Sequence, residues 1–182
     1  MTRLAQSMIA ATLLLSACGG GSTTEPLTPM EKGQAHLDAI LVSPIFDPST
    51  AVMPGAGSAS YSGEFGIVVT ASPNLGALGD AQMTVDFAAG DMNGSVTNFV
   101  GFQQDGAGNV ILANEVAGTA TLDGSFVGSN GHLNVTGDIE GDALAGGMFT
   151  DFKGAGAETL VGIGSGDIDG IPIDYFLHVE QN

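Results

Sequence analysis

Apolar and polar residues alternate in short runs from about residue 57 to the end of the chain. In residues 83–87, Met, Val and Phe fall on one side of an extended chain while Thr and Asp fall on the other, and residues 132–139 and 171–180 repeat this period. A period of two is typical of half-buried β-strands. No helical period follows, so the sequence predicts an all-β domain over residues 57–182.

Turn-forming residues separate these runs. Asn, Asp and Gly tolerate the positive φ of tight hairpins, which predicts turns at residues 91–94, 105–108, 123–124, 129–131 and 169–170. Hairpins make sequential strands antiparallel neighbours. About eight such runs favour a small antiparallel up-and-down β-barrel, in which closure removes exposed sheet edges. The absence of Trp and the shortness of the runs argue against a barrel that spans a membrane.

The segment before the barrel has a different pattern. Residues 19–29 mix Gly, Ser, Thr and Pro without hydrophobic periodicity, which predicts a flexible linker. Thr28-Pro29-Met30-Glu31 offers an N-cap, a proline at the first helical position and a carboxylate three residues after the cap. A short helix is therefore predicted to begin here and to end before Pro44.

The first eighteen residues have the layout of an export signal. Arg3 precedes an apolar run over residues 8–15, which is too short for the ~20 residues of a membrane-spanning helix. Leu15-Ser16-Ala17-Cys18 resembles the bacterial lipobox. That resemblance implies cleavage before Cys18 and its modification with diacylglycerol and a fatty-acyl chain such as palmitate. The alternative is an ordinary signal peptide with an incidental cysteine.

The charge balance restricts the class of partner. The chain has 3 basic and 20 acidic residues and a formal net charge of −17. Such a surface repels nucleic acid and anionic lipid, and would favour a cationic or metal-bearing partner. The alternative is that the acidic surface serves solubility or salty surroundings.

Few residues suggest chemistry. The single cysteine excludes disulfides and thiolate zinc sites within the mature domain. His36, His132 and His178 are too scattered to suggest a metal triad, and the last two fall on the polar side of predicted strands. The sequence contains no Gly-x-Ser-x-Gly elbow. We therefore expect no catalytic residues, no resident metal, no cofactor and no enzymatic activity.

Two acidic stretches, residues 137–142 and 166–170, could gather oxygen ligands for Ca²⁺. Neither supplies the ligand positions of an EF-hand loop, and the glycine–aspartate pattern at residues 162–167 occurs once rather than in tandem. Hairpin turns are the favoured interpretation.

Two segments carry a resemblance to a known family. Residues 85–99 (VDFAAGDMNGSVTNF) and residues 147–162 (GMFTDFKGAGAETLVG) resemble a strand pair and a glycine-rich hairpin of the transferrin-binding protein B-like β-barrel family, in the expected order. The usual Gly-Pro of that hairpin is replaced around Lys153-Gly154-Ala155. The resemblance covers roughly residues 57–180, which leaves room for one barrel, so transferrin binding itself is not carried over.

The expected organisation is a signal peptide over residues 1–17, a lipidated Cys18 with linker and short helix over residues 18–56, and a barrel over residues 57–182. The resemblance implies a lipoprotein of the outer membrane, exposed at the cell surface. Its expected role is to bind an extracellular protein or an iron- or haem-type nutrient. Gly19-Gly20 lacks the aspartate that retains some lipoproteins at the inner membrane. The alternative function is a structural or envelope-maintenance lipoprotein with a self-filled barrel.

Overall fold

The computed structural model describes residues 27–41, 43 and 51–182, which form one helix and nine strands. The elements are α1 (Pro29–Leu41), β1 (Ser58–Val69), β2 (Ser72–Asp86), β3 (Asp91–Gln104), β4 (Val110–Glu115), β5 (Gly118–Val127), β6 (Asn130–Ile139), β7 (Asp142–Lys153), β8 (Thr159–Ile168) and β9 (Ile171–Gln181).

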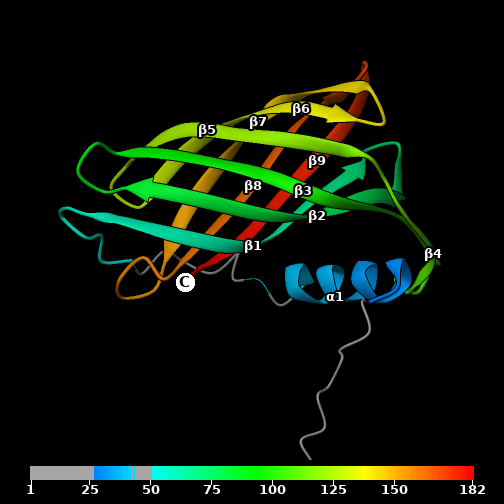
Figure 1. The fold of residues 1–182 in the computed structure, drawn as a ribbon, viewed down its shortest axis with the longest axis horizontal. Coiled ribbons are helices and arrows are strands. Elements are labelled where there is room, and N and C mark those ends of the chain that lie inside the picture. The colour runs from blue at the N-terminus through cyan, green and yellow to red at the C-terminus, as the bar shows by residue number, and fades with distance from the viewer. Residues whose placement is uncertain (1–26, 42, 44–50) are drawn as a thin grey trace, which may run out of the picture.

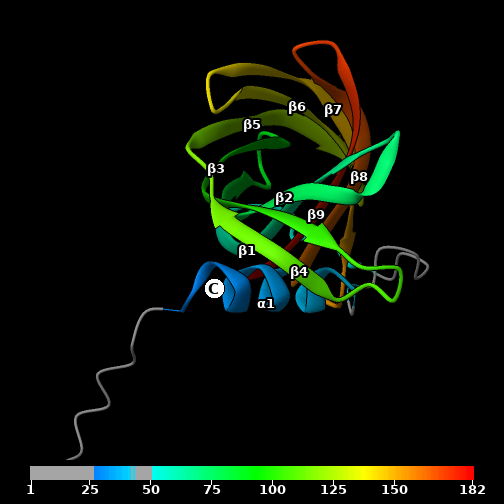
Figure 2. The same ribbon diagram turned by 90° about the vertical axis from the view of Figure 1, so that its right-hand side faces the viewer.

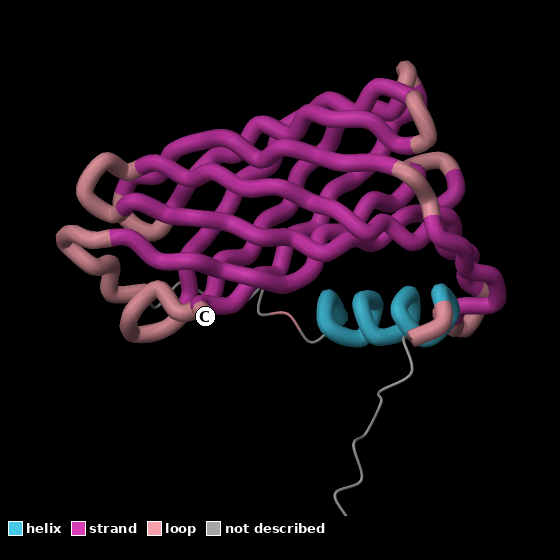
Figure 3. The backbone as a smooth tube through the Cα atoms, in the orientation of Figure 1, coloured by secondary structure: helices cyan, strands magenta, loops and turns pink. Residues whose placement is uncertain are grey.

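The sheet closes into a barrel (Figures 1 and 3). Its strand order is β2-β1-β9-β8-β7-β6-β5-β3-β4, every pairing is antiparallel, and β2 also pairs with β3. Eight strands therefore form a closed ring and β4 lies outside it. The predicted barrel class is confirmed, with β4 as an additional strand.

β3 is longer than β5, its neighbour on one side in the ring. β4 pairs with the part of β3 that extends beyond β5. β3 pairs with β5 over residues 91–96 and with β4 over residues 100–104. The two partners thus share one edge of β3, and β4 extends away from the barrel toward α1 (Figure 2). We call this end of the barrel, which also carries the β1–β2, β6–β7 and β8–β9 turns, the β4 end.

Side chains fill the barrel interior. Tyr61, Phe65, Phe99, Phe152 and Tyr175 are almost completely buried there. Edge-to-face and tilted ring contacts join them, for example between Phe65 and Phe99. The strands are 6 to 15 residues long, and most exceed the short runs read from the sequence. In these strands, apolar side chains face the barrel interior and polar side chains face outward. A barrel that spans a membrane has the reverse alternation, with apolar side chains toward the lipid.

Helix α1 begins with the predicted capping box. The Thr28 N–H donates to Glu31 Oε2 at 2.9 Å, and the Glu31 N–H donates to Thr28 Oγ1 at 3.3 Å. The helix packs against β4, where the Val110 N–H donates to Gln34 Oε1 at 3.4 Å. Within the described residues, no helix has the length and apolar character needed to cross a membrane.

Three predicted turns are wrong in position. The β2–β3 turn lies at residues 87–90 rather than 91–94, because Asp86 Oδ1 accepts hydrogen bonds from the N–H groups of Ala88 and Ala89, and Gly90 supplies a φ of 78°. The β5–β6 turn lies at residues 128–129, one position before the predicted 129–131.

The predicted turn at Asp123-Gly124 is instead the middle of β5. A glycine stands there because β6 passes so closely that a Cβ at residue 124 would overlap the main-chain carbonyl of His132. The turns at residues 105–108 and 169–170 are confirmed.

Candidate functional site

Cys18, the predicted lipidation site, lies outside the described residues, as do the signal peptide and the linker up to residue 26. These predictions therefore stay predictions.

The two acidic stretches form hairpin turns, as favoured. Glu140-Gly141 and Asp169-Gly170 each have two successive positive φ angles, 55° and 92° in the first pair and 49° and 84° in the second. Asp167 Oδ1 accepts a hydrogen bond from the Gly170 N–H at 3.0 Å. The Asp167 carboxylate therefore stabilises the β8–β9 turn.

No metal-ligating group among the described residues contains more than one histidine. His132 is exposed on β6 and packs edge-on against Phe149, with ring centroids 5.6 Å apart. His178 lies on the outer face of β9, opposite Glu64 in the β1–β9 pairing. Both therefore occupy the polar face of their strands, as predicted.

His36 belongs to a group that the sequence did not reveal, the His36 cluster of His36, Glu64 and Asp80. Its imidazole, on the barrel-facing side of α1, lies over β1 and β2. Nδ1 contacts Glu64 Oε2, and Nε2 lies 3.6 Å from Asp80 Oδ1. Glu64 and Asp80 are directly opposite each other in the β1–β2 pairing. The alternation of inward and outward side chains along β1 and β2 is enough to predict that both acids lie on the outer face. No feature of the sequence predicts that α1 packs over them.

Burial sets the electrostatics of this cluster. The side chain of His36 is buried, and desolvation lowers its pKa, opposed by Asp80 and reinforced by Lys32. Lys32 itself lies 3.7 Å from Glu115 on β4. The cluster thus brings together three groups that could hold a metal ion or a proton.

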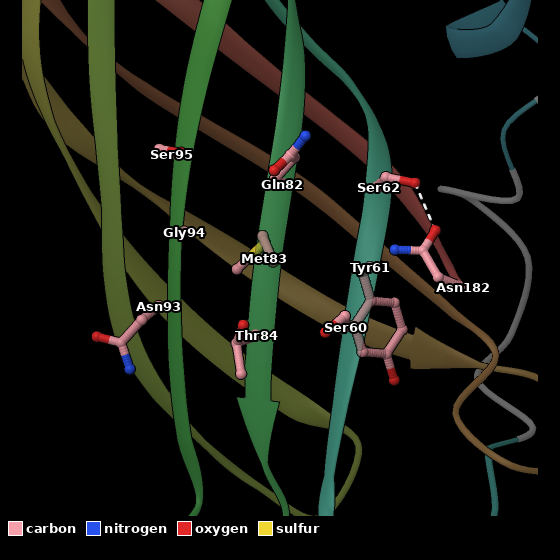
Figure 4. A pocket seen from close by; sticks show the side chains of 10 residues that line it. All are labelled: Ser60, Tyr61, Ser62, Gln82, Met83, Thr84, Asn93, Gly94, Ser95 and Asn182. Atoms are coloured by element: carbon pink, nitrogen blue, oxygen red, sulfur yellow. Dashed lines mark hydrogen bonds between the residues drawn. The ribbon is translucent and has the colours of Figure 1, made fainter.

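A second surface is a polar hollow of about 570 Å³ on the outside of β1, β2 and β3 (Figure 4). Its outward side chains are hydroxyls and amides, including Ser60, Gln82 and Asn93, and the Ser62 hydroxyl donates to Asn182 Oδ1 at 2.6 Å. No Asp, Glu, Lys, Arg or His lines it. It offers hydrogen bonds without acid–base chemistry.

A third surface is apolar and lies at the β4 end. A hollow of about 370 Å³ opens between the barrel mouth and β4, and its lining comes from six strands, the β4–β5 connection and the β6–β7 turn. Ile67, Ile139 and Ile168 form its floor, and Leu75 and Leu112 at its rim are 39% and 57% exposed. An apolar concavity with exposed aliphatic side chains at its rim is a typical binding site.

A row of three apolar side chains lies on the side wall. Phe149 on β7 pairs with Ile163 on β8, which pairs with Phe176 on β9. Phe149 is 75% exposed. The described part of the chain thus offers two apolar surfaces, one at the β4 end and one on the wall.

Comparison with known proteins shows which solved structures share this fold. No protein-family model matches the sequence, and no curated protein matches it. Among solved structures, a mutant of transferrin binding protein B from Haemophilus parasuis Hp5 matches with a TM-score of 0.51 and 16% identity over 71% of this chain. The intact Ap-TbpB structure, with N and C lobes, matches with a TM-score of 0.50 and 14% identity over 71% of this chain.

The chain spans 27% of the length of each of these two proteins. At such identity the likeness concerns the fold alone, and it confirms the predicted resemblance at that level. The barrel is of the transferrin-binding protein B type.

Proposed function

We propose that this chain is a lipoprotein of the outer membrane, exposed at the cell surface, whose barrel binds an extracellular protein or an iron- or haem-type nutrient without catalysing a reaction. The observation that carries the proposal is the apolar hollow at the β4 end. The barrel interior is filled, so a ligand would contact the barrel's ends and outer surface rather than its centre.

The rim residues explain why a protein partner fits this end best. Leu75 and Leu112 lie at the rim, and Ile111, which is also exposed on β4, is not part of the lining. β4 pairs with β3 along one edge and is the last strand of the sheet, and α1 packs against it, with Gln34 Oε1 accepting a hydrogen bond from the Val110 N–H. Two of the solved proteins with this barrel are named for binding transferrin, which supports a protein as the class of ligand.

The experiment is affinity capture from extracellular fluid with the wild-type chain and a Leu75→Asp/Leu112→Asp variant. We expect a partner to be retained by the wild type and lost by the variant, because carboxylates at the rim of an apolar contact remain unpaired when buried. Val127→Asp is the matched control, since Val127 is 87% exposed at the opposite end. Titration with haem, followed by its absorbance, tests the nutrient class with the same three proteins.

Retention by the double variant, with loss in a Phe149→Asp variant, would move the binding surface to the side wall and contradict the assignment. If nothing is retained and haem does not bind, the second candidate function applies, a structural lipoprotein of the envelope. The filled interior favours that candidate, because the barrel needs no ligand to complete its core.

A further inference from the structure

We propose that the His36 cluster binds one divalent transition-metal ion, of which Zn²⁺ is the probe, and that this ion fastens α1 to the wall of the barrel. The ligands would be one imidazole nitrogen of His36 and one oxygen from each of Glu64 and Asp80. This site is separate from the apolar hollow at the β4 end and does not depend on the proposed function.

The geometry brings three ligands from three elements together. One ligand atom from each residue lies within 4.8 Å of the other two. Zinc binds nitrogen and oxygen ligands at about 2.0–2.2 Å, which puts neighbouring ligands roughly 3–4 Å apart. Glu64 faces Nδ1 of His36 and Asp80 faces Nε2, so closing the three ligands around one ion requires the imidazole as well as the two carboxylates to turn.

The buried atoms of the cluster make no other hydrogen bonds. His36 is 7% exposed, and its Nδ1 and Glu64 Oε2 are buried facing each other. Neither atom has a hydrogen-bond partner elsewhere among the described residues. Buried polar atoms are normally paired with protein, water or an ion, so these two atoms are accounted for when they bind a cation.

The charges around the site also favour a bound cation. Glu64 and Asp80 face each other across a β-ladder, where like charges are destabilising. The described residues contain two lysines and no arginine. Lys32 pairs with Glu115, and Lys153 pairs with Asp151.

Asp80 is held in position by a neighbouring strand. Asn98 Nδ2 donates to Asp80 Oδ2 at 2.7 Å, which leaves Oδ1 directed at His36. Asn98 has a φ of 55°, and the β2–β3 register shifts between Leu78 and Asp80. Outer hydrogen bonds of this kind orient the carboxylates that bind metals, and bulges often re-aim side chains at sites.

The ligand types select the metal. An imidazole nitrogen with two carboxylates suits Zn²⁺ and its transition-metal neighbours, whereas Ca²⁺ and Mg²⁺ prefer all-oxygen sets. The Asp80 side chain is 48% exposed, so the ion can enter from solvent and a water can complete a four-coordinate site.

The test is zinc titration of the full chain, purified in detergent and stripped with a chelator, by isothermal titration calorimetry. We expect one Zn²⁺ per chain and a rise in Tm of about 5–10 °C at a zinc concentration of a hundred times Kd. Glu64→Gln and Asp80→Asn should each weaken binding at least about tenfold. Both substitutions keep the side-chain shape and remove a like charge, so we expect the metal-free variants to remain folded.

Asp38→Asn is the matched control. Asp38 is an acid on the same helix, but its carboxylate accepts a hydrogen bond from Gln34 Nε2 at 2.8 Å and lies outside the cluster. This variant should bind zinc like the wild type, and Ca²⁺ should leave every Tm unchanged. The proposal is overturned if zinc does not bind stoichiometrically, or if Asp38→Asn weakens binding as much as Glu64→Gln and Asp80→Asn do.

Discussion

Tyr61 and Tyr175 are buried phenols whose hydroxyls donate to main-chain carbonyl oxygens, to Ala157 at 2.5 Å and to Ala145 at 3.0 Å. Burial raises the pKa of each to about 12, with a further contribution from Asp167 for Tyr175. Because the raised pKa favours the neutral phenol in the folded state, this contribution to stability is complete below pH 10 and is lost as the pH rises through 12.

We therefore predict that both tyrosines ionise about two pH units later than free tyrosine, together with alkaline unfolding. Absorbance at 295 nm reports this directly, because the chain has two Tyr and no Trp. The urea-unfolded chain is the control and should titrate near 10. A folded chain in which both phenols titrate near 10 contradicts the burial of these residues.

At the scale of single elements, the capping box determines how firmly α1 begins. Thr28 Oγ1 accepts from the Glu31 N–H, and removing such a cap costs about 1 kcal/mol. Thr28→Ala should therefore speed hydrogen exchange of the α1 amides about fivefold, measured by mass spectrometry or NMR. Thr119→Ala, an exposed threonine on β5, should leave that exchange unchanged. Equal exchange in both variants would show that packing alone holds the helix start.

The elements differ in how far the sequence predicts them. Strands were predictable because inward residues such as Val135 and Leu177 follow a strict period of two, and α1 was predictable from its capping box. Turns were harder to predict, because glycine occurs in the strands as well as in the turns. Gly124 is required by the close passage of β6, a contact between strands that local sequence does not encode.

Non-local pairings set the limit of sequence reasoning for the site. β4 depends on the extra length of β3, and the His36 cluster depends on a helix that packs across two strands. His36, Glu64 and Asp80 are separated by 28 and 16 positions, a spacing that matches no metal-binding motif. Topology brings them together, so only the three-dimensional arrangement reveals the cluster.

In the whole molecule, the filled core accounts for stability, and the surface charge affects how the protein attaches to a membrane. The packed interior supplies stability without disulfides, since Cys18 is the single cysteine. A net charge of −17 repels anionic headgroups, so the folded domain would not stay on a membrane by surface attraction. We therefore expect membrane attachment to depend wholly on acyl chains at Cys18, of which two or more are needed for stable binding.

The prediction is that Cys18→Ser abolishes incorporation of labelled palmitate and moves the protein from the membrane fraction to the soluble fraction. The wild type should stay with the membrane in high salt, because salt screens charge and leaves acyl insertion intact. Ser22→Ala, a neutral change four positions further along, is the control and should fractionate as the wild type. If the Cys18→Ser protein remains on the membrane and salt releases it, attachment is electrostatic, and the basic partner of this acidic barrel must then belong to the membrane itself.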